Sequence, residues 1–173
     1  LTQAAVALEG MEGIARAVHE VTGIPVAIED RYGNLRAWAG PDQPARYPKD
    51  PPPRREQLLR RMLREGACLW ESGRVMRVAS PRPDSVGVIA LIDPQHAARD
   101  EDLAALDYGA TILSLELARL RSIADTEVRV RRDLVEDLLD GIDAHEAIPR
   151  GEAFNHDLTR PHRVVVFQGR GRV

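Results

Sequence analysis

Apolar residues at alternating intervals of three and four, between residues 103 and 124, constrain the fold of this chain more than any other feature. This spacing places its members along one side of an α-helix, as at the a and d positions of a coiled coil. The members, which we call the leucine seam, are Leu103, Leu106, Ala110, Leu113, Leu117, Leu120 and Ala124. Asp100 is a favourable N-cap, and Glu101 and Asp102 suit the first turn of a helix. We therefore predict a long helix that begins near residue 100.

The leucine seam has to be buried, and two surfaces could bury it. Its five leucines would each contribute roughly 1.5–3 kcal/mol on burial, before the cost of association is counted. We predict that it pairs with a second copy, in a homodimer interface formed by Leu103, Leu106, Ala110, Leu113, Leu117 and Leu120. The alternative is that part of the seam packs against the chain's own sheet or first helix, because three heptads are a minimum for a coiled coil.

A second apolar stripe begins at Val130, in a different phase from the seam. Glu127 and Arg131 occupy the positions at which the seam would continue. We predict a bend or a change of register between Ile123 and Val130.

The residues before the seam predict a mixed sheet with helices. Helical spacing covers 4–21 and 54–65, and strand composition covers 24–29, 35–39, 67–71, 74–80 and 85–92. Short connections between strands favour antiparallel neighbours. The expected fold class is α+β: an antiparallel sheet of five or six strands, flanking helices and a long C-terminal helical arm.

Composition excludes several classes of function. The formal net charge is −3 and the isoelectric point about 6.0, so the chain lacks the basic field of a nucleic-acid-binding or membrane-surface domain. No stretch approaches the roughly 20 apolar residues of a membrane span. Cys68 is the only cysteine, which suits a reducing cytoplasm and excludes an internal disulfide. We expect a cytoplasmic protein that contacts no membrane.

No catalytic or metal-binding constellation is visible. The five histidines are scattered, and the serines lack the context of a nucleophile elbow. Glu29 and Asp30 lie at a predicted hairpin turn, where acids are usually solvated. We interpret Cys68 as a buried, inert thiol, with a redox sensor as the alternative. We predict no catalytic residues, no metal and no cofactor.

A binding cavity is the remaining possibility for chemistry. Residues 40–53 include six prolines and should form a long surface loop. Side chains that could converge beneath this loop and the 54–65 helix are Trp38, Tyr47, Trp70, Met76 and Arg77. We predict that they bind a small molecule; alternatively, the tryptophans are plain core or rim residues.

Two segments carry a family resemblance. Residues 131–141 read Arg-Arg-Asp-Leu-Val-Glu-Asp-Leu-Leu-Asp-Gly, and His156-Asp157-Leu158 precedes Arg163-Val164-Val165-Val166. In these segments the chain resembles PucR/CdaR-type bacterial transcription regulators, at the helix that leaves their sensor and at the opening of their GGDEF-like domain. No ligand-binding motif of that family can be transferred residue by residue.

The resemblance implies a domain order and a function. Residues 1–125 would be a GAF-like sensor of the PAS/GAF superfold with its dimerisation helix, 126–158 a helical linker, and 159–173 the start of a GGDEF-like domain with a strand over 163–167. The implied function is to bind a small-molecule effector and to relay its presence through the arm to a DNA-binding domain absent from this chain.

Three other functions remain open. The chain could be a GAF module of a kinase, phosphatase or cyclase, or a ligand-free dimerisation scaffold. A GAF-fold reductase is the third, although its chemistry would need more cysteines than Cys68.

Overall fold

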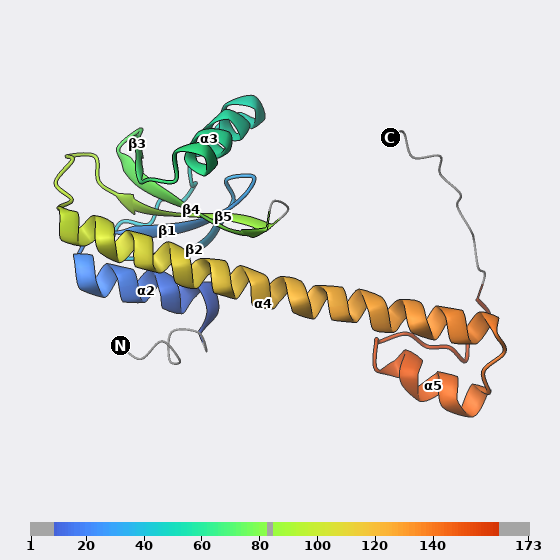
Figure 1. The fold of residues 1–173 in the computed structure, drawn as a ribbon. Helices are drawn as coiled ribbons and strands as arrows, with labels where there is room; N and C mark the ends of the chain where they lie inside the picture. The colour runs from blue at the N-terminus through green and yellow to red at the C-terminus, as the bar shows by residue number, and fades with distance from the viewer. Residues whose placement is uncertain (1–8, 83–84, 163–173) are drawn as a thin grey trace. The chain divides into compact units, whose positions relative to one another are not determined.

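The structure is a computed structural model that describes residues 9–82 and 85–162. The chain divides into two compact units, Leu1–Ser122 and Ile123–Val173. The first unit contains the sheet (Figure 1), and the residues of the candidate site belong to the same unit. Among the described helices, none combines the length and the apolar character that a membrane span requires. The predicted strand over 163–167 lies outside the described residues.

A five-stranded antiparallel sheet forms the centre of the first unit, in the order β2-β1-β5-β4-β3. Its strands are β1 (Val26–Asp30), β2 (Leu35–Ala39), β3 (Leu69–Glu71), β4 (Arg74–Arg82) and β5 (Ser85–Ile92). All five match strands expected from the sequence. The α+β class with an antiparallel sheet, flanking helices and a long helix is therefore confirmed.

The β1–β2 hairpin shows how local chemistry sets the register. One carboxylate oxygen of Asp30 accepts hydrogen bonds from the backbone N–H groups of Tyr32 and Asn34, at 2.9 Å each. The other accepts the Asn34 side-chain amide at 2.6 Å. Asp30 thus fixes the turn, and a register shift between Ile28 and Glu29 follows directly upstream.

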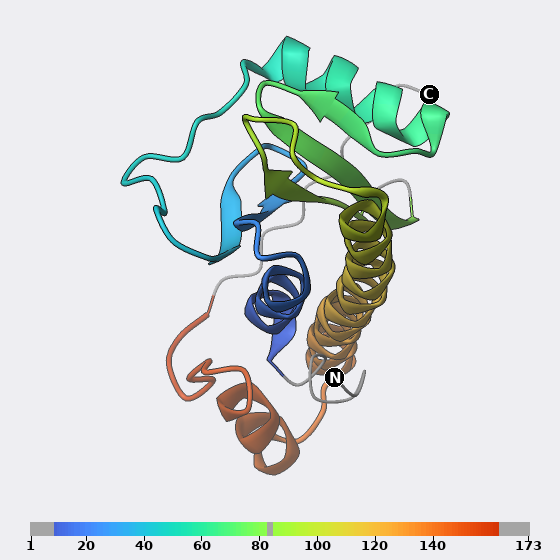
Figure 2. The same ribbon diagram turned by 90° about the vertical axis from the view of Figure 1, so that its left-hand side faces the viewer.

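Two helices, α2 (Gly10–Thr22) and α4 (Asp100–Leu139), cover one face of the sheet in the first unit (Figures 1 and 2). A Cβ atom at Gly109 of α4 would lie only 2.7 Å from a methyl carbon of Val18 in α2. Glycine therefore permits the close approach of the two helices. The core between them and the sheet includes Ile14, Val26, Val75, Ile89 and Leu91.

The leucine seam faces this core. Leu106, Ala110 and Leu113 are buried at 0%, 4% and 0% exposure, and Leu103 and Leu117 pack against the same cluster while partly buried. Leu120 is 40% exposed. The interface prediction is therefore corrected for the seam: its central side chains are occupied by the chain's own sheet and α2. The alternative of intrachain packing describes them.

The opposite face of the sheet is covered in two different ways. Helix α3 (Pro52–Glu65) packs on one part, where Leu58 and Met62 join Leu69, Met76, Val88 and Ala90 in a second apolar cluster. The proline-rich segment before α3 covers another part without regular structure. The candidate site lies under this segment.

In the second unit, the end of α4 and helix α5 (Ala144–Glu152) contribute the buried side chains Leu134 and Ala147. Helix α5 ends at Glu152, before the end of the helical linker expected over 126–158. Helix α4 itself continues without interruption from Asp100 to Leu139, so the change of apolar phase expected between Ile123 and Val130 falls within one helix. The ion pair between Glu127 and Arg131, one turn apart at 2.6 Å, supports the helix where the seam ends.

Candidate functional site

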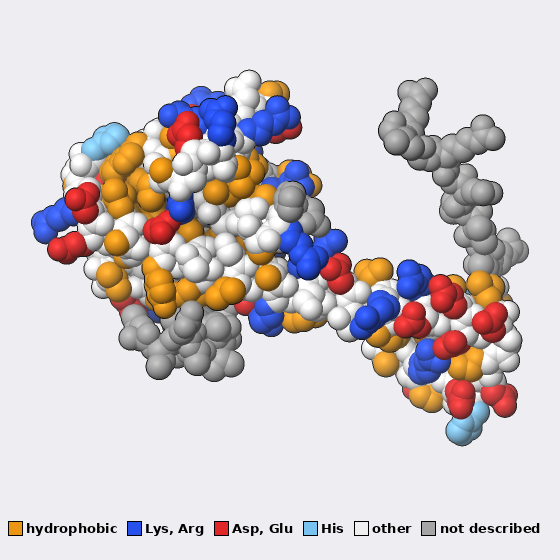
Figure 3. All heavy atoms as spheres, viewed as in Figure 1, with side chains coloured by type: hydrophobic (Ala, Val, Ile, Leu, Met, Phe, Trp, Pro, Cys, Tyr) orange, Lys and Arg blue, Asp and Glu red, His pale blue; other side chains and the backbone are white. Residues whose placement is uncertain are grey.

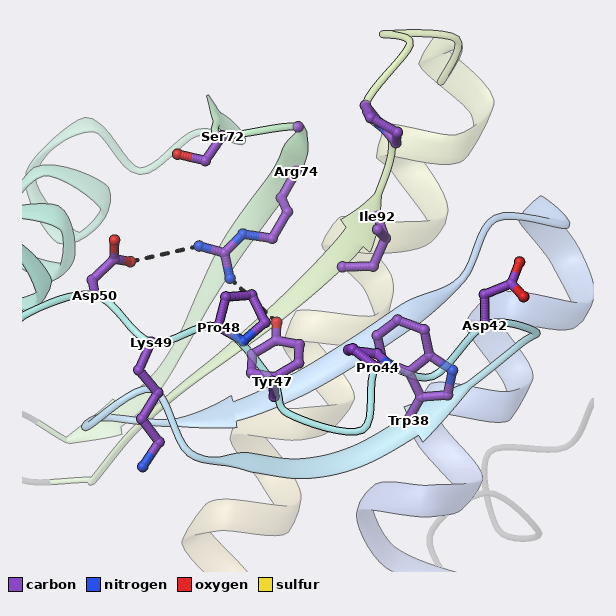
Figure 4. A pocket seen from close by; sticks show the side chains of 12 residues that line it. Trp38, Asp42, Pro44, Tyr47, Pro48, Lys49, Asp50, Ser72, Arg74 and Ile92 are labelled. Atoms are coloured by element: carbon purple, nitrogen blue, oxygen red, sulfur yellow. Dashed lines mark hydrogen bonds and ion pairs between the residues drawn. The ribbon is translucent and has the colours of Figure 1, made fainter.

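A pocket of about 430 Å³ opens between the proline-rich loop, the β3–β4 turn and the end of β5 (Figure 4). We call it the loop pocket. Its lining consists of Trp38, Asp42, Pro44, Tyr47, Pro48, Lys49, Asp50, Ser72, Gly73, Arg74, Ile92 and Pro94. Volumes of about 300–1,000 Å³ are usual for small-molecule sites. The loop pocket has the size and the partly apolar lining of such a site.

A buried carboxylate organises the base of this region. Glu29, at the register shift in β1, is only 2% exposed. Its Oε2 accepts a hydrogen bond from Arg55 Nη1 at 2.6 Å, and its Oε1 accepts one from Arg74 Nη1 at 2.7 Å. The sequence-based interpretation of Glu29 as a solvated turn residue is wrong. Glu29 follows Ile28 in β1 and pairs with Val88, so the alternation of the strand turns its side chain to the face of the sheet that α3 covers.

Arg55 connects α3 to the end of β1 and to the turn that follows it. Besides its bond to Glu29, it donates from Nη2 to the carbonyl of Asp30 at 2.8 Å and from Nε to the carbonyl of Arg31 at 3.2 Å. All three guanidinium nitrogens are thus used, which is the condition under which a buried ion pair is tolerated. Helix α3 is held to the end of β1 by charge as well as by apolar contact.

Tyr47 connects the proline-rich loop to the Glu29 carboxylate. Its hydroxyl donates to Glu29 Oε1 at 2.5 Å. Burial raises the pKa of Tyr47 far above its usual value, and the negative charge and hydrogen bond of Glu29 act in the same direction. The phenol is therefore neutral at any physiological pH and remains a hydrogen-bond donor.

Arg74 forms the cationic wall of the pocket. Its Nη1 also donates to the Tyr47 hydroxyl at 3.2 Å, while its Nη2 lies 3.6 Å from Asp50 Oδ2. Burial alone would lower the pKa of Arg74, but the charges of Glu29 and Asp50, together with the hydrogen bond to Tyr47, reverse that effect and raise it. The guanidinium carries a fixed positive charge at the pocket surface.

Trp38 supplies the apolar wall. Its ring meets that of Tyr47 edge to face, with centroids 6.4 Å apart, and its indole N–H donates to the carbonyl of Gly40 at 3.0 Å. Such a pair contributes more than area burial alone. The polar atom of the indole is satisfied, so the ring face is the part left for a ligand.

Two of the five predicted ligand-binding residues line the pocket, Trp38 and Tyr47. Trp70 instead stacks on His96 with ring centroids 4.7 Å apart. Met76 is fully buried beneath α3, and Arg77 pairs with Asp107 of α4 at 2.6 Å. Neighbouring residues of a strand point to opposite faces of the sheet, so Met76 and Arg77 could not share one pocket. The prediction is corrected for these three.

Sequence reasoning missed Glu29, Arg55 and Arg74. The available signal was the arginine content of the 54–65 helix together with an acid at the end of an otherwise apolar strand. Pairing such residues requires the sheet order, because Glu29 and Arg74 lie on strands separated by β5.

Cys68 is half-buried, and burial raises the pKa of its thiol, which the nearby Arg77 offsets only in part. Little reactive thiolate forms at neutral pH under such conditions. Across residues 9–82 and 85–162, no group of three or more His, Cys, Asp and Glu side chains is placed to hold a metal ion.

Comparison with known proteins leaves the family open. No protein-family model and no curated protein matches the sequence. Two solved structures that resemble the fold are the gliding protein MglB from Thermus thermophilus and an MglB with a tetrameric arrangement. Their TM-scores are 0.40 and 0.39, with 12% and 13% identity, over 69% of this chain and 93% of each of those chains.

These comparisons correct the family expectation. The two structures named above are MglB proteins, and no family model supports a PucR/CdaR-type regulator, so that assignment and the GAF label are wrong. The DNA-binding output and the GGDEF-like segment were implied by the same resemblance and lose their basis with it. At such low identity the likeness to MglB concerns the fold alone.

Proposed function

We propose that the first unit is a non-catalytic regulatory module that binds a small-molecule effector in the loop pocket. The observation that carries the proposal is the pocket itself, which joins an aromatic and proline-lined wall to one fixed guanidinium. Few polar groups within an apolar lining are typical of ligand sites. A cytoplasmic setting is part of the proposal, since Cys68 is the only cysteine.

The position of the pocket suits a regulatory role. Ile92 and Pro94 line it, and between them Asp93 is buried and accepts the backbone N–H groups of Ala97 and Ala98 at 3.0 and 2.8 Å. This connection leads directly into α4. A ligand that moves the pocket wall would therefore act on the start of the longest helix in the molecule.

Self-association is the second part of the proposal, on a surface other than the leucine seam. Helix α4 carries six exposed, uncharged residues spaced four and three apart on the side opposite the seam: Ala104, Tyr108, Thr111, Leu115, Ala118 and Ser122. We call them the outer stripe. Tyr108 and Leu115 are 57% and 58% exposed. Figure 3 shows hydrophobic side chains on the face of the first unit along which α4 runs.

An uncharged solvent-facing stripe is unusual in a chain with 29% charged residues. Its order of small and large residues is nearly symmetric about Thr111. In an antiparallel pair, Ala104 would face Ala118 and Tyr108 would face Leu115 of the second copy. The stripe therefore fits a two-fold contact with itself.

The binding proposal is tested with a Trp70→Phe protein, in which Trp38 is the only tryptophan. A panel of small acids, amines and neutral aromatics is screened by thermal shift and by Trp38 fluorescence. We expect at least one compound to raise the melting temperature and to change the Trp38 emission. The matched Trp38→Phe protein reports from Trp70, outside the pocket, and should show no such change in emission. If no compound moves either signal, the unit is a ligand-free scaffold.

A further inference from the structure

The charges around the loop pocket point to the class of ligand, an inference that rests on the function proposed above. Four ionised side chains form its base: Glu29 and Asp50 with Arg55 and Arg74. The two acids balance the two arginines. Glu29 supplies one negative charge for the two arginines, and Asp50 from the loop supplies the second.

Asp50 holds this position weakly. Among the described residues its ion pairs are 3.6 Å to Arg74 Nη2 and 3.5 Å to Arg54 Nε. Charge-assisted hydrogen bonds are usually about 2.7–2.9 Å long. The contacts of Glu29 with Arg55 and Arg74, at 2.6 and 2.7 Å, are by contrast short.

The donor that Asp50 faces is directed into the pocket. Arg74 uses Nη1 for both of its hydrogen bonds, to Glu29 and Tyr47, and Nη2 makes none within the described part of the chain. Figure 4 shows the guanidinium between Asp50 and the Tyr47 hydroxyl, with the Lys49 side chain turned away from it. One planar anionic group could bind Nη2 more closely than Asp50 does.

We propose that the loop pocket binds a small monocarboxylate with an aromatic or apolar body, and that the ligand's carboxylate replaces Asp50 on Nη2 of Arg74. The body of the ligand then lies against Trp38, Pro44 and Tyr47. Displacement of Asp50 frees the loop at the point where it enters α3, because Arg54 and Pro52 follow directly.

The charge balance favours a monocarboxylate over a dianion such as a phosphate ester. Removal of Asp50 from Arg74 leaves one positive charge to neutralise on that guanidinium, and a carboxylate supplies one negative charge. Lys49, the other cation of the lining, is turned away and donates a hydrogen bond to Asn34. Asp42 lies at the other end of the lining, beside Trp38 in Figure 4, where a second negative charge on the ligand would be repelled.

The test compares phenylacetate and a series of related arylalkanoates with their primary amides, which match them in shape. Binding is measured by calorimetry and by Trp38 fluorescence in the Trp70→Phe protein. We expect each acid that binds to bind more tightly than its amide. In Asp50→Asn the acids should bind about fivefold more tightly, because the competing carboxylate is gone, while the amides should be nearly unaffected.

Asp42→Asn is the matched control. It removes an acid from the same lining, and asparagine tolerates the positive φ of 58° at this position. Its effect on the acids should be smaller than that of Asp50→Asn. Arg74→Lys keeps the positive charge but loses the planar guanidinium. It should weaken the binding of the acids and leave the binding of the amides unchanged, and circular dichroism checks that the variant is folded.

The outcomes separate this inference from the proposed function. Acids and amides that bind equally, or Asp50→Asn with unchanged affinity for acids, would overturn the carboxylate proposal while the pocket remains a binding site. Binding of amines or neutral compounds alone would also overturn the carboxylate proposal and leave the pocket as a binding site. If no compound of the series binds at millimolar concentration and the wider screen is also silent, the proposed function fails as well.

Discussion

The two faces of the sheet are covered by different means, and the contrast explains where the candidate site lies. On one face α2 and α4 satisfy their own backbone groups and present apolar side chains, so the space is filled by a continuous core. On the other face, a proline-rich loop covers part of the sheet and cannot pack as a helix does. There the chain uses the buried charges of Glu29 and Arg55 and the half-buried charge of Arg74, and leaves a pocket.

The helix-covered face is therefore filled with apolar side chains, whereas the loop-covered part of the other face retains a pocket. A loop that is held by a few ion pairs can also be released by a ligand that competes for them. Four changes test or sharpen this difference.

Glu29→Gln should be the most damaging of them. It removes the carboxylate but leaves Arg55 buried, and an uncompensated buried charge costs about 3–5 kcal/mol. Urea unfolding followed by circular dichroism measures the loss. Glu56→Gln, which breaks the exposed pair with Arg60, is the control and should leave the unfolding midpoint unchanged. Equal midpoints for the two variants would show that the charge network is not structural.

Leu113→Ala probes the helix-covered face. Leu113 is fully buried, so its truncation should cost about 3 kcal/mol through lost burial and a cavity. Leu115, two residues along the same helix, is exposed, and Leu115→Ala should leave stability almost unchanged. If the two substitutions had the same effect on urea unfolding, the seam would not be the core stripe of this unit.

Leu115→Glu tests the outer stripe. A charge opposite Tyr108 in a two-fold apolar contact should weaken self-association at least about tenfold, since each 1.4 kcal/mol is a factor of ten. Sedimentation velocity over a concentration series measures it. Leu63→Glu on α3, another exposed leucine, is the matched control and should associate as the parent does. A parent protein that is monomeric at every concentration, or a Leu115→Glu protein that associates like it, would remove the outer stripe from the account.

The smallest expected effect is a pH dependence. The pKa of Tyr47 is raised in the folded state, so above the unfolded value of about 10 the unfolded chain loses a proton that the folded chain retains. Stability should therefore fall as the pH rises above about 10. Tyr47→Phe should lose this part of the fall, seen as a shallower dependence of the urea midpoint between pH 9 and 11. An identical slope in both proteins would contradict the buried position of the phenol.

The sequence was sufficient for the fold class because strand alternation and helix spacing are local signals. It could not decide what buries the leucine seam, since Leu106 and Leu113 have the same spacing whether they face a sheet or a second copy. Helix α4 also stays continuous where the apolar phase changes, and the ion pair between Glu127 and Arg131 supports the helix there.

For the site, sequence reasoning found the loop and its aromatic residues but not the charges. Trp38, which precedes the proline-rich loop, and Tyr47, which lies within it, were identified because this loop was expected to lie on the sheet. Met76 and Arg77 were both assigned to the site although they are neighbours in β4. Side chains alternate along a strand, so only one of the two can lie on the face that carries the pocket. The alternation of β1 places Glu29 on the face that α3 covers, but its partners Arg55 and Arg74 follow only from the order of the strands and the position of α3.

The central claim is that a small molecule binds under the proline-rich loop, and its most direct test is the proton–nitrogen spectrum of the uniformly ¹⁵N-labelled protein. Trp38 and Trp70 are the only tryptophans, so two indole N–H signals are expected. Titration with phenylacetate and with phenylacetamide should shift the Trp38 signal and leave that of Trp70, which stacks on His96 outside the pocket, in place. A Trp38 signal that neither compound moves, or a shift confined to Trp70, would contradict the account.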